Sequence, residues 1–358
     1  MAAYTTIDNP ELYFQTKLYS GDGSTDVSHT FDGSEDMQPD MVWFKRLNGS
    51  ANHFLYDSVR GANRSLVPND TDVEATSGEQ TTFLSSFDSD GFTLGDDSNN
   101  VNGSGQSYVL WAWKAGTSFT NDASATSVGS IDSAGSINTT AGFSIIEWSG
   151  SEANATIAHG LQAVPKMIIC KDTNDTYNWG VYHHKNTSAP ETDYLYLNTN
   201  AATGDSSSAW NDTTPTSTVF SVGNAGATNA SGTDNMIAYC FSDVQGFSKF
   251  GSYTGNGNAD STFVYTGFRP AWVMIKRTTS TVYNWMIFDN KRNTFNVIDD
   301  RLRANTADAE QTGSSTHILD FVSNGFKIRS SNSAIGGGGD PYIYMAFAEA
   351  PFVNSNGV

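Results

Sequence analysis

The chain has 358 residues, which is enough for two or three ordinary domains. Hydrophobic residues make up 38% of it, aromatic residues 12% and charged residues 16%, a balance that favours β domains with aromatic cores over a disordered chain. The formal net charge of −19 argues against binding to nucleic acid or to an anionic membrane surface.

The first 16 residues lack the basic and apolar regions of a signal peptide. No apolar stretch in the chain approaches the ~20 residues that a membrane span needs. We therefore expect no membrane insertion and expect the chain to be made and folded in a cytoplasm.

A first unit is predicted for residues 17–115. It contains Pro39–Lys45, which reads proline, an apolar run and lysine. Proline lacks an N–H and suits the start of a strand, and the short run of Val, Trp and Phe predicts a strand buried on both faces. Phe54–Asp57 follows a polar turn as a hairpin partner, Phe87–Phe92 spans a glycine turn, and Tyr108–Lys114 is the closing strand.

Residues 116–140 are dominated by Ser, Thr, Ala, Gly and Asn, which predicts a linker or a weakly structured connection. A second unit follows at 141–244, and a third at 245–358 ends in a C-terminal tail. Each repeats the proline–lysine strand, as Pro165–Lys171 and Pro270–Lys276.

Six landmarks occur in the same order in all three units: an aromatic-x-Gly, the P-x5-K strand, an aromatic pair, L-x-x-N, a glycine turn and an aromatic closing strand. The L-x-x-N copies are Leu66–Asn69, Leu195–Asn198 and Leu302–Asn305. A unit of about one hundred residues is longer than the ~20–50 residues of solenoid repeats. Turn residues interrupt the chain every ~8–12 positions. We predict an all-β chain of three tandem antiparallel β-sandwich or jelly-roll-like repeats, with the P-x5-K strands internal to their sheets.

Catalytic motifs such as G-x-S-x-G, H-E-x-x-H and the P-loop are missing from the sequence. His183 and His184 are neighbours in a predicted strand and would point to opposite faces, which disfavours joint metal binding. Glu147 is the best single candidate for a glycosidase acid, but Leu18 and Ser252 stand at the matching positions and no second acidic residue stands out as its partner. We predict no enzyme, and no catalytic, cofactor-binding or metal-binding residues.

Asp57 and Asp289 precede Arg60 and Arg292 by three positions, which predicts structural ion pairs. His183 stands at the corresponding position of the second unit, so this pair is expected to be missing there.

The acidic loops Asp88–Asp97 and Asp299–Asp300 could hold a structural Ca²⁺, but EF-hand spacing is absent and solvated turns are the preferred interpretation. We predict no cofactor. Gly336–Gly339, followed by Asp340, is interpreted as a flexible hairpin tip before the closing strand rather than a phosphate-binding loop.

Cys170 and Cys240 lie in apolar strand-like runs, which favours two buried free thiols, and their spacing leaves a single disulfide open. Tyr177, Tyr194 and Trp210 lie outside the repeated positions. Such aromatic side chains stack on sugar rings or anchor interfaces when exposed, and core packing is an equally good interpretation of each. No binding residue is assigned from the sequence.

Distinctive sequence motifs occur in six segments spread over nearly the whole chain. They are Tyr4–Gln15, Met37–Lys45, Asp57–Gly61, Gly246–Gly257, Thr266–Lys276 and Phe347–Gly357. Together they resemble a family of virion-associated proteins encoded by tailed phages of marine bacteria. Members of that family are labelled tail-fibre or structural proteins, sometimes lectin-like. The resemblance implies localisation to a virion, assembled in the host cytoplasm, and it brings no catalytic motif.

Two functions remain open. The first is a virion structural component, such as a tail fibre, tail or capsid-surface decoration protein, which would contact other virion proteins and form a symmetric homo-oligomer. The second is a carbohydrate-binding adhesin that recognises a host-surface glycan. A lectin is expected to gather Tyr or Trp with Asn and Asp at one sheet face or loop end, whereas a decoration protein spreads apolar contacts over a flat surface.

Residues 1–16 precede the first unit and are rich in apolar side chains. These are Tyr4, Ile7, Leu12, Tyr13 and Phe14. Termini that are not tied down are usually poorly ordered, so a terminus with this composition favours docking. We expect this segment to attach to a neighbouring subunit or to another virion protein.

Overall fold

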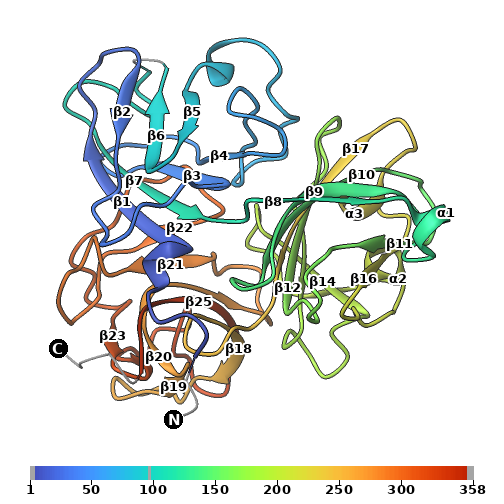
Figure 1. Ribbon diagram of the computed structural model, residues 1–358. Helices are drawn as coiled ribbons and strands as arrows, with labels where there is room; N and C mark the ends of the chain where they lie inside the picture. The colour runs from blue at the N-terminus through green and yellow to red at the C-terminus, as the bar shows by residue number, and fades with distance from the viewer. Residues whose placement is uncertain (1–4, 96–97, 353–358) are drawn as a thin grey trace.

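A computed structural model describes residues 5–95 and 98–352 of the protein (Figure 1). Strands contain 40% of the residues and helices 5%, and the strands form several antiparallel sheets, none of them closed. The predicted all-β class is confirmed. The helices of the described residues are single turns: η1 Pro10–Leu12, η2 Glu79–Thr81, α1 Ala123–Thr126, α2 Ser207–Trp210 and α3 Gly226–Asn229.

The first unit contains seven strands. They are β1 Phe14–Ser20, β2 Val27–His29, β3 Met41–Arg46, β4 Phe54–Asp57, β5 Leu84–Asp88, β6 Gly91–Leu94 and β7 Ser107–Trp113. A four-stranded sheet has the order β1-β7-β3-β4, and a smaller sheet has the order β2-β6-β5.

Ten strands follow between residues 117 and 241. They are β8 Thr117–Asn121, β9 Ser133–Asn138, β10 Phe143–Ser149, β11 Ala155–Ala158, β12 Met167–Asp172, β13 Gly180–His183, β14 Asp193–Tyr196, β15 Gly204–Asp205, β16 Val219–Val222 and β17 Asn235–Phe241. Eight of them form one sheet in the order β15-β14-β13-β12-β17-β10-β9-β8, while β11 and β16 pair separately.

The third unit contains the remaining strands. They are β18 Ser248–Thr254, β19 Phe263–Tyr265, β20 Phe268–Arg277, β21 Met286–Asp289, β22 Leu302–Arg303, β23 Leu319–Val322, β24 Gly325–Ile328 and β25 Pro341–Pro351. The large sheet has the order β18-β25-β20-β21-β22, and the small sheet has the order β19-β24-β23.

One strand order recurs in the large sheets, as β1-β7-β3-β4, β10-β17-β12-β13 and β18-β25-β20-β21. The P-x5-K strands β3, β12 and β20 are therefore internal, and their residues Val42, Ile169 and Met274 are at most 5% exposed. The predicted internal, buried position of these strands is confirmed. The proline does not always start the strand: β20 runs through Pro270, at a register shift in its pairing with β25.

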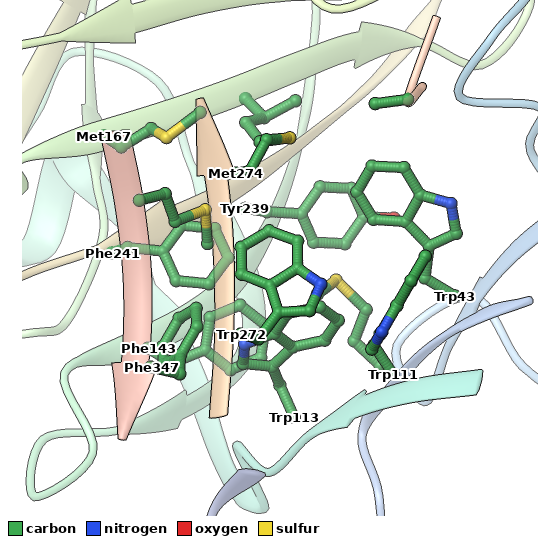
Figure 2. Packing of buried hydrophobic residues seen from close by; sticks show 14 of the residues in the cluster. Trp43, Trp111, Trp113, Phe143, Met167, Tyr239, Phe241, Trp272, Met274 and Phe347 are labelled. Carbon is green, nitrogen blue, oxygen red and sulfur yellow. The ribbon is translucent and has the colours of Figure 1, made fainter. Parts of the chain in front are cut away.

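The three units share one hydrophobic core. Trp111 of the first unit, Tyr239 of the second and Trp272 of the third belong to the same buried cluster, in which side chains of all three large sheets converge (Figure 2). The Trp272 ring packs edge-on against Trp111 and Trp113, with centroids 6.2 and 5.8 Å apart. The opposite face of each large sheet packs on the small sheet of its own unit in a separate cluster. Aromatic side chains thus fill both faces of every large sheet.

Hydrogen bonds link the units in a cycle at matching positions. Tyr239 donates from its hydroxyl to Asp57 Oδ2 at 2.6 Å, which joins the second unit to the first. Trp111 Nε1 donates to Asp289 Oδ2 at 3.1 Å, which joins the first to the third. His183 Nε2 lies 3.1 Å from the Tyr344 carbonyl oxygen and joins the second to the third.

The L-x-x-N asparagines have one structural role in all three units. Asn69, Asn198 and Asn305 accept hydrogen bonds from the backbone N–H groups of His53, Trp179 and Trp285, at 2.7, 3.0 and 2.9 Å. Each also donates from its side-chain amide to a second asparagine, at 2.7 to 2.9 Å. This second asparagine directly precedes His53, Trp179 or Trp285 in the sequence. The motif therefore fixes the loop that leads into the strand after the P-x5-K strand.

The lysines of the P-x5-K strands are buried and donate to backbone carbonyl groups. Lys45 Nζ donates to the carbonyl oxygens of Ala51 and, across the unit boundary, Ala307. Lys276 does the same with Tyr283 and Asn200. Burial lowers the pKa of each of these lysines to about 8.

Residues 116–140 form structure that the sequence did not predict. They contain β8, α1 and β9, and the two strands extend the large sheet of the second unit beyond β10 (Figure 1). Glycine is required at position 135, since a Cβ there would lie 1.9 Å from the Ile145 carbonyl oxygen. The composition that suggested a linker thus belongs to a closely paired strand.

The described part of the N-terminal segment docks within its own chain. Ile7 and Phe14 belong to the central cluster, and the Phe14 ring stacks on Phe347 of the third unit at 5.0 Å. Thr5 Oγ1 donates to the Gln245 carbonyl oxygen at 2.5 Å. Ile7 and Phe14 are thus packed within the chain itself. Attachment of the segment to a neighbouring subunit or to another virion protein stays a prediction, and Tyr4 lies outside the described residues.

The glycine run before β25 is packed rather than a free tip. Gly336 and Gly337 are buried, and a Cβ on Gly336 would lie 1.9 Å from the Ser330 carbonyl oxygen. The Tyr342 hydroxyl accepts from the Gly337 N–H at 2.9 Å. The expectation of a flexible tip is wrong for these two residues, while Gly338 and Gly339 are exposed.

Candidate functional site

A cleft of about 610 Å³ lies between the first and second units. One wall is the outer end of the second unit's large sheet, formed by β8, β9, β10 and β17, and the other is the segment after β4. The lining residues are Val59, Arg60, Arg64, Glu74, Thr120, Asn121, Asp122, Asp132, Ser133, Ala134, Glu147, Trp148, Ser149, Thr173, Asn235, Met236 and Ile237.

The cleft forms where the central face of the second sheet changes from apolar to polar. Along β10 the residues on this face are Ile145, which belongs to the central core, and then Glu147 and Ser149, which are exposed. Ile237 of β17 lies opposite Glu147 in the register. The same face of the sheet therefore packs in the central core at one end and presents polar side chains to the cleft at the other.

An ion-pair network forms the wall from the first unit. Arg60 Nε pairs with Asp57 Oδ2 at 2.7 Å, and Arg60 Nη1 pairs with Glu74 Oε1 at 3.1 Å. Arg64 Nη1 pairs with the second Glu74 oxygen at 3.0 Å, while 41% of the Arg64 side chain is exposed. Burial opposes the charge of Arg60, but Asp57, Tyr239 and Glu74 outweigh it and raise the Arg60 pKa. Arg64 is thus the cationic group that a ligand in the cleft can reach.

Glu147 faces this network across the cleft. Within the described part of the chain, its carboxylate makes no hydrogen bond or ion pair. Partial burial raises the Glu147 pKa, the negative charges of Asp57 and Glu74 act in the same direction, and Arg60 opposes them. The residue that the sequence singled out therefore lines this cleft, with a carboxyl group that is easier to protonate than usual.

Other acidic residues share the cleft with Glu147, although none stood out in the sequence as its partner. Glu74 is held by its two arginines, and Asp132 accepts from the Ala123 N–H at 2.8 Å. Asp122 caps α1. Hydrogen bonds lower the pKa of Asp122, and the one from the Ser124 side chain has the largest effect. These carboxylates are already engaged as acceptors, so the arrangement suits ligand binding better than paired acid–base chemistry.

The predicted ion pairs are confirmed. Arg292 Nε pairs with Asp289 Oδ2 at 2.6 Å and Arg292 Nη1 with Glu310 Oε1 at 2.8 Å, which reproduces the Asp57–Arg60–Glu74 network in the third unit. Glu74 and Glu310 stand five residues after the L-x-x-N asparagines, and this shared offset is the sequence signal that could have identified Glu74.

The histidine pair is used for structure. Nδ1 of His183 accepts from the Lys185 N–H at 3.2 Å, and its Nε2 faces the Tyr344 carbonyl. His184 Nε2 lies 2.9 Å from the Phe250 carbonyl oxygen. Burial, reinforced by the neighbouring His184, lowers the His183 pKa to about 3, so this ring is neutral near pH 7.

The predicted acidic loops are satisfied by protein donors. Asn293 Nδ2 donates to Asp299 Oδ1 at 3.3 Å and to Asp300 Oδ2 at 3.0 Å. The Asp88 carboxylate accepts from Ser86 and Thr93. Asp96 and Asp97 lie outside the described residues.

Two of the three aromatic candidates, Trp210 and Tyr194, pack in the same cluster of the second unit. Trp210 is buried in the core of the second unit, and the Tyr194 ring packs against Tyr196 with centroids 5.0 Å apart. Tyr177 is 44% exposed. Cys170 and Cys240 are both buried free cysteines, and burial raises the pKa of each thiol.

These features define an all-β protein whose three large sheets have one strand order and enclose a common aromatic core, with a polar cleft between two of them. The chain belongs to the family described as Domain of unknown function (DUF7483), whose model matches residues 9–351. No curated protein and no solved structure matches the chain. Over the described residues, every helix is too short to cross a membrane.

Proposed function

We propose that the chain is a non-enzymatic structural component of a tailed-phage virion, in a tail fibre, the tail or a capsid-surface decoration. The observation that carries the proposal is the uneven distribution of exposed apolar side chains. Among residues 5–95 and 98–352, nine large hydrophobic side chains are exposed, and six of them belong to the third unit: Phe263, Tyr265, Val282, Phe295, Val297 and Phe352. This pattern suits a molecule that attaches through its third unit.

The β19 face is defined as the outward side chains of Phe263 and Tyr265, two of these exposed aromatic residues. The two residues alternate with buried Val264, so they project from the same side of the strand and are 44% and 56% exposed. β19 is an edge strand, paired with β24 alone in its sheet. Aromatic residues are enriched in protein interfaces, and an edge strand can add main-chain contacts. We infer that this face contacts other virion proteins or a second copy of the chain in a homo-oligomer.

Mass spectrometry of purified particles of the encoding phage tests the virion assignment. The chain is expected among the particle proteins, and its absence from the particles overturns the assignment. A variant with Phe263→Ser and Tyr265→Ser then tests the β19 face. It is expected to keep the far-UV spectrum of the parent protein and to lose incorporation or self-association. Val73→Ser in the first unit, where the side chain is 42% exposed, is the matched control and should assemble normally.

Carbohydrate binding is the second candidate, and the polar cleft favours it. Arg64 and Glu147 offer an exposed cation and an unpaired carboxyl group, and Asn121, Thr173 and Asn235 add amide and hydroxyl groups. Such a mixture of donors and acceptors suits the hydroxyl groups of a sugar. A glycan array probed with the protein and with Arg64→Ala and Glu147→Gln tests it. Binding lost in both variants supports the adhesin role, and binding that survives in both rules out the cleft.

We also propose that the three units are tandem repeats of one antiparallel β-sandwich of jelly-roll type. The shared strand order and the three matching asparagine pairs support this. Superposition of the units in an experimental structure tests it: the asparagine pairs should coincide, and units that superpose only with a shifted strand register contradict it.

A further inference from the structure

A single position distinguishes the second unit from the other two at the end of the P-x5-K strand. In β3 the residue after the lysine is Arg46, which pairs with Tyr108. In β20 it is Arg277, which pairs with Tyr342. In β12 the same position is Asp172, which pairs with Met236. The register thus places a carboxylate where the other units have a guanidinium group.

The arginines bind an oxygen acceptor located two residues before the pairing partner. Arg46 Nη2 donates to the side-chain oxygen of Gln106, and Arg277 Nη2 forms an ion pair with Asp340 Oδ1 at 2.6 Å. The residue at this offset in the second unit is Asp234. Two carboxylates therefore meet at a place where the other units pair a cation with an oxygen.

A third carboxylate joins them. One oxygen each of Asp172, Asp175 and Asp234 lies within 4.8 Å of the others. Asp172 is fully buried; its Oδ1 accepts from the N–H groups of Asn174 and Asp175 at 2.7 and 3.0 Å. Its Oδ2 is buried without a hydrogen-bond partner in the described structure. A buried carboxylate oxygen without a donor is costly, so this oxygen calls for a positive group.

The neighbouring lysine does not supply that group. Lys171 Nζ donates to the backbone carbonyl oxygens of Asp172 and Asp175, at 2.5 and 2.9 Å. The Asp72 carboxylate of the first unit also acts on Lys171. In the described structure the Lys171 ammonium group thus adjoins three clustered carboxylates and is also acted on by Asp72, which leaves an excess of negative charge.

We propose that Asp172, Asp175 and Asp234 bind a divalent cation of the hard, oxygen-preferring class, with Ca²⁺ as the best fit. Ca²⁺ accepts 6–8 oxygen ligands in flexible geometry, and water can complete the shell because Asp175 is exposed and Asp234 half-buried. The ion takes the place of the guanidinium group of Arg46 and Arg277. Mg²⁺ fits less well, because it demands strict octahedral geometry.

The site adjoins the cleft between the first two units. Thr173 and Asn235 line that cleft, and each directly follows a proposed ligand in the sequence. The Thr173 carbonyl oxygen also accepts from the Glu74 N–H at 2.8 Å, which connects the two walls. Bound cation thus holds the ends of β12 and β17 together and fixes one wall of the cleft.

Calorimetric titration of the chelator-treated full chain with CaCl₂ and, separately, MgCl₂ tests the proposal. We expect one Ca²⁺ site, weaker Mg²⁺ binding and a rise in melting temperature with Ca²⁺. Asp175→Asn, at an exposed position, should fold normally and bind Ca²⁺ at least about tenfold more weakly, since the site loses one of its charged ligands. Asp172→Arg recreates the arrangement of the other units and should lose both the binding and the thermal shift.

The control is Asp300→Asn, which changes an acidic loop outside the site and should leave Ca²⁺ binding unchanged. Absence of Ca²⁺ binding by the parent protein overturns the proposal. So does binding that is unchanged in both Asp175→Asn and Asp172→Arg.

Discussion

The second unit and the third unit solve the same structural problem with different chemistry. The third unit buries a charged network in which Arg292 joins Asp289 and Glu310. At the matching positions the second unit has His183, Asn186 and Thr203, and the Thr203 hydroxyl donates to Asn186 Oδ1 at 2.7 Å. The strand order is the same in both sheets. The comparison teaches that the fold accepts neutral polar groups at this position as well as charged ones.

The largest expected effect comes from removing the cation of the charged network. Arg292→Ala leaves the fully buried Asp289 without its partner and is expected to cost about 3–5 kcal/mol of unfolding free energy. Asn186→Ala, the matched change in the second unit, removes a neutral hydrogen bond and should cost about 1 kcal/mol. Guanidinium unfolding of the two variants measures the difference, and equal losses would contradict the contrast between the units.

Where the units agree, equal effects are expected. Asn69→Ala, Asn198→Ala and Asn305→Ala each remove the acceptor of a backbone N–H and the donor to a second asparagine. Leaving such a group unsatisfied costs about 1–3 kcal/mol. Urea unfolding should give similar losses for the three variants, and a loss in only one unit would show that the motif has different roles.

An effect that accumulates only gradually, with falling pH, is specific to the second unit. The neutral His183 is buried beside His184 and Lys185, and its folded pKa of about 3 lies below the ordinary value of 6.5. Since the unfolded chain takes up the proton first, stability is lost as the pH falls from about 6.5 towards about 3, by about 1.4 kcal/mol per unit for this group. His183→Gln should reduce the slope of unfolding free energy against pH by this amount near pH 5. An unchanged slope would mean that His183 is protonated in the folded protein.

The internal strands and the ion pairs could be predicted from the sequence because local signals encode them. A short apolar run after proline specifies a buried strand, and an Asp three residues before an Arg can pair with it within one turn. The asparagine motif was visible, but its partner asparagine precedes the next strand, and only the fold shows why the two meet.

Features that depend on contacts between residues far apart in the chain could not be predicted from the sequence. β9 is rich in Ser, Ala, Gly and Asn, which give a weak strand signal, and it forms a strand because it pairs with β10 and β8. Glu74 joins Glu147 in the cleft only because the first and second units pack together. Asp172 and Asp234 are 62 positions apart, computed as 234 − 172, and meet through the register of β12 and β17.

Diffraction from crystals of the full chain grown with Ca²⁺ and then soaked with a lanthanide ion tests the contrast between the units most directly. The account predicts an anomalous peak among the carboxylates of Asp172, Asp175 and Asp234, and none beside Arg46 or Arg277. A crystal in which these three carboxylates hold no ion, while lanthanide binds at the Asp299–Asp300 loop instead, would contradict it.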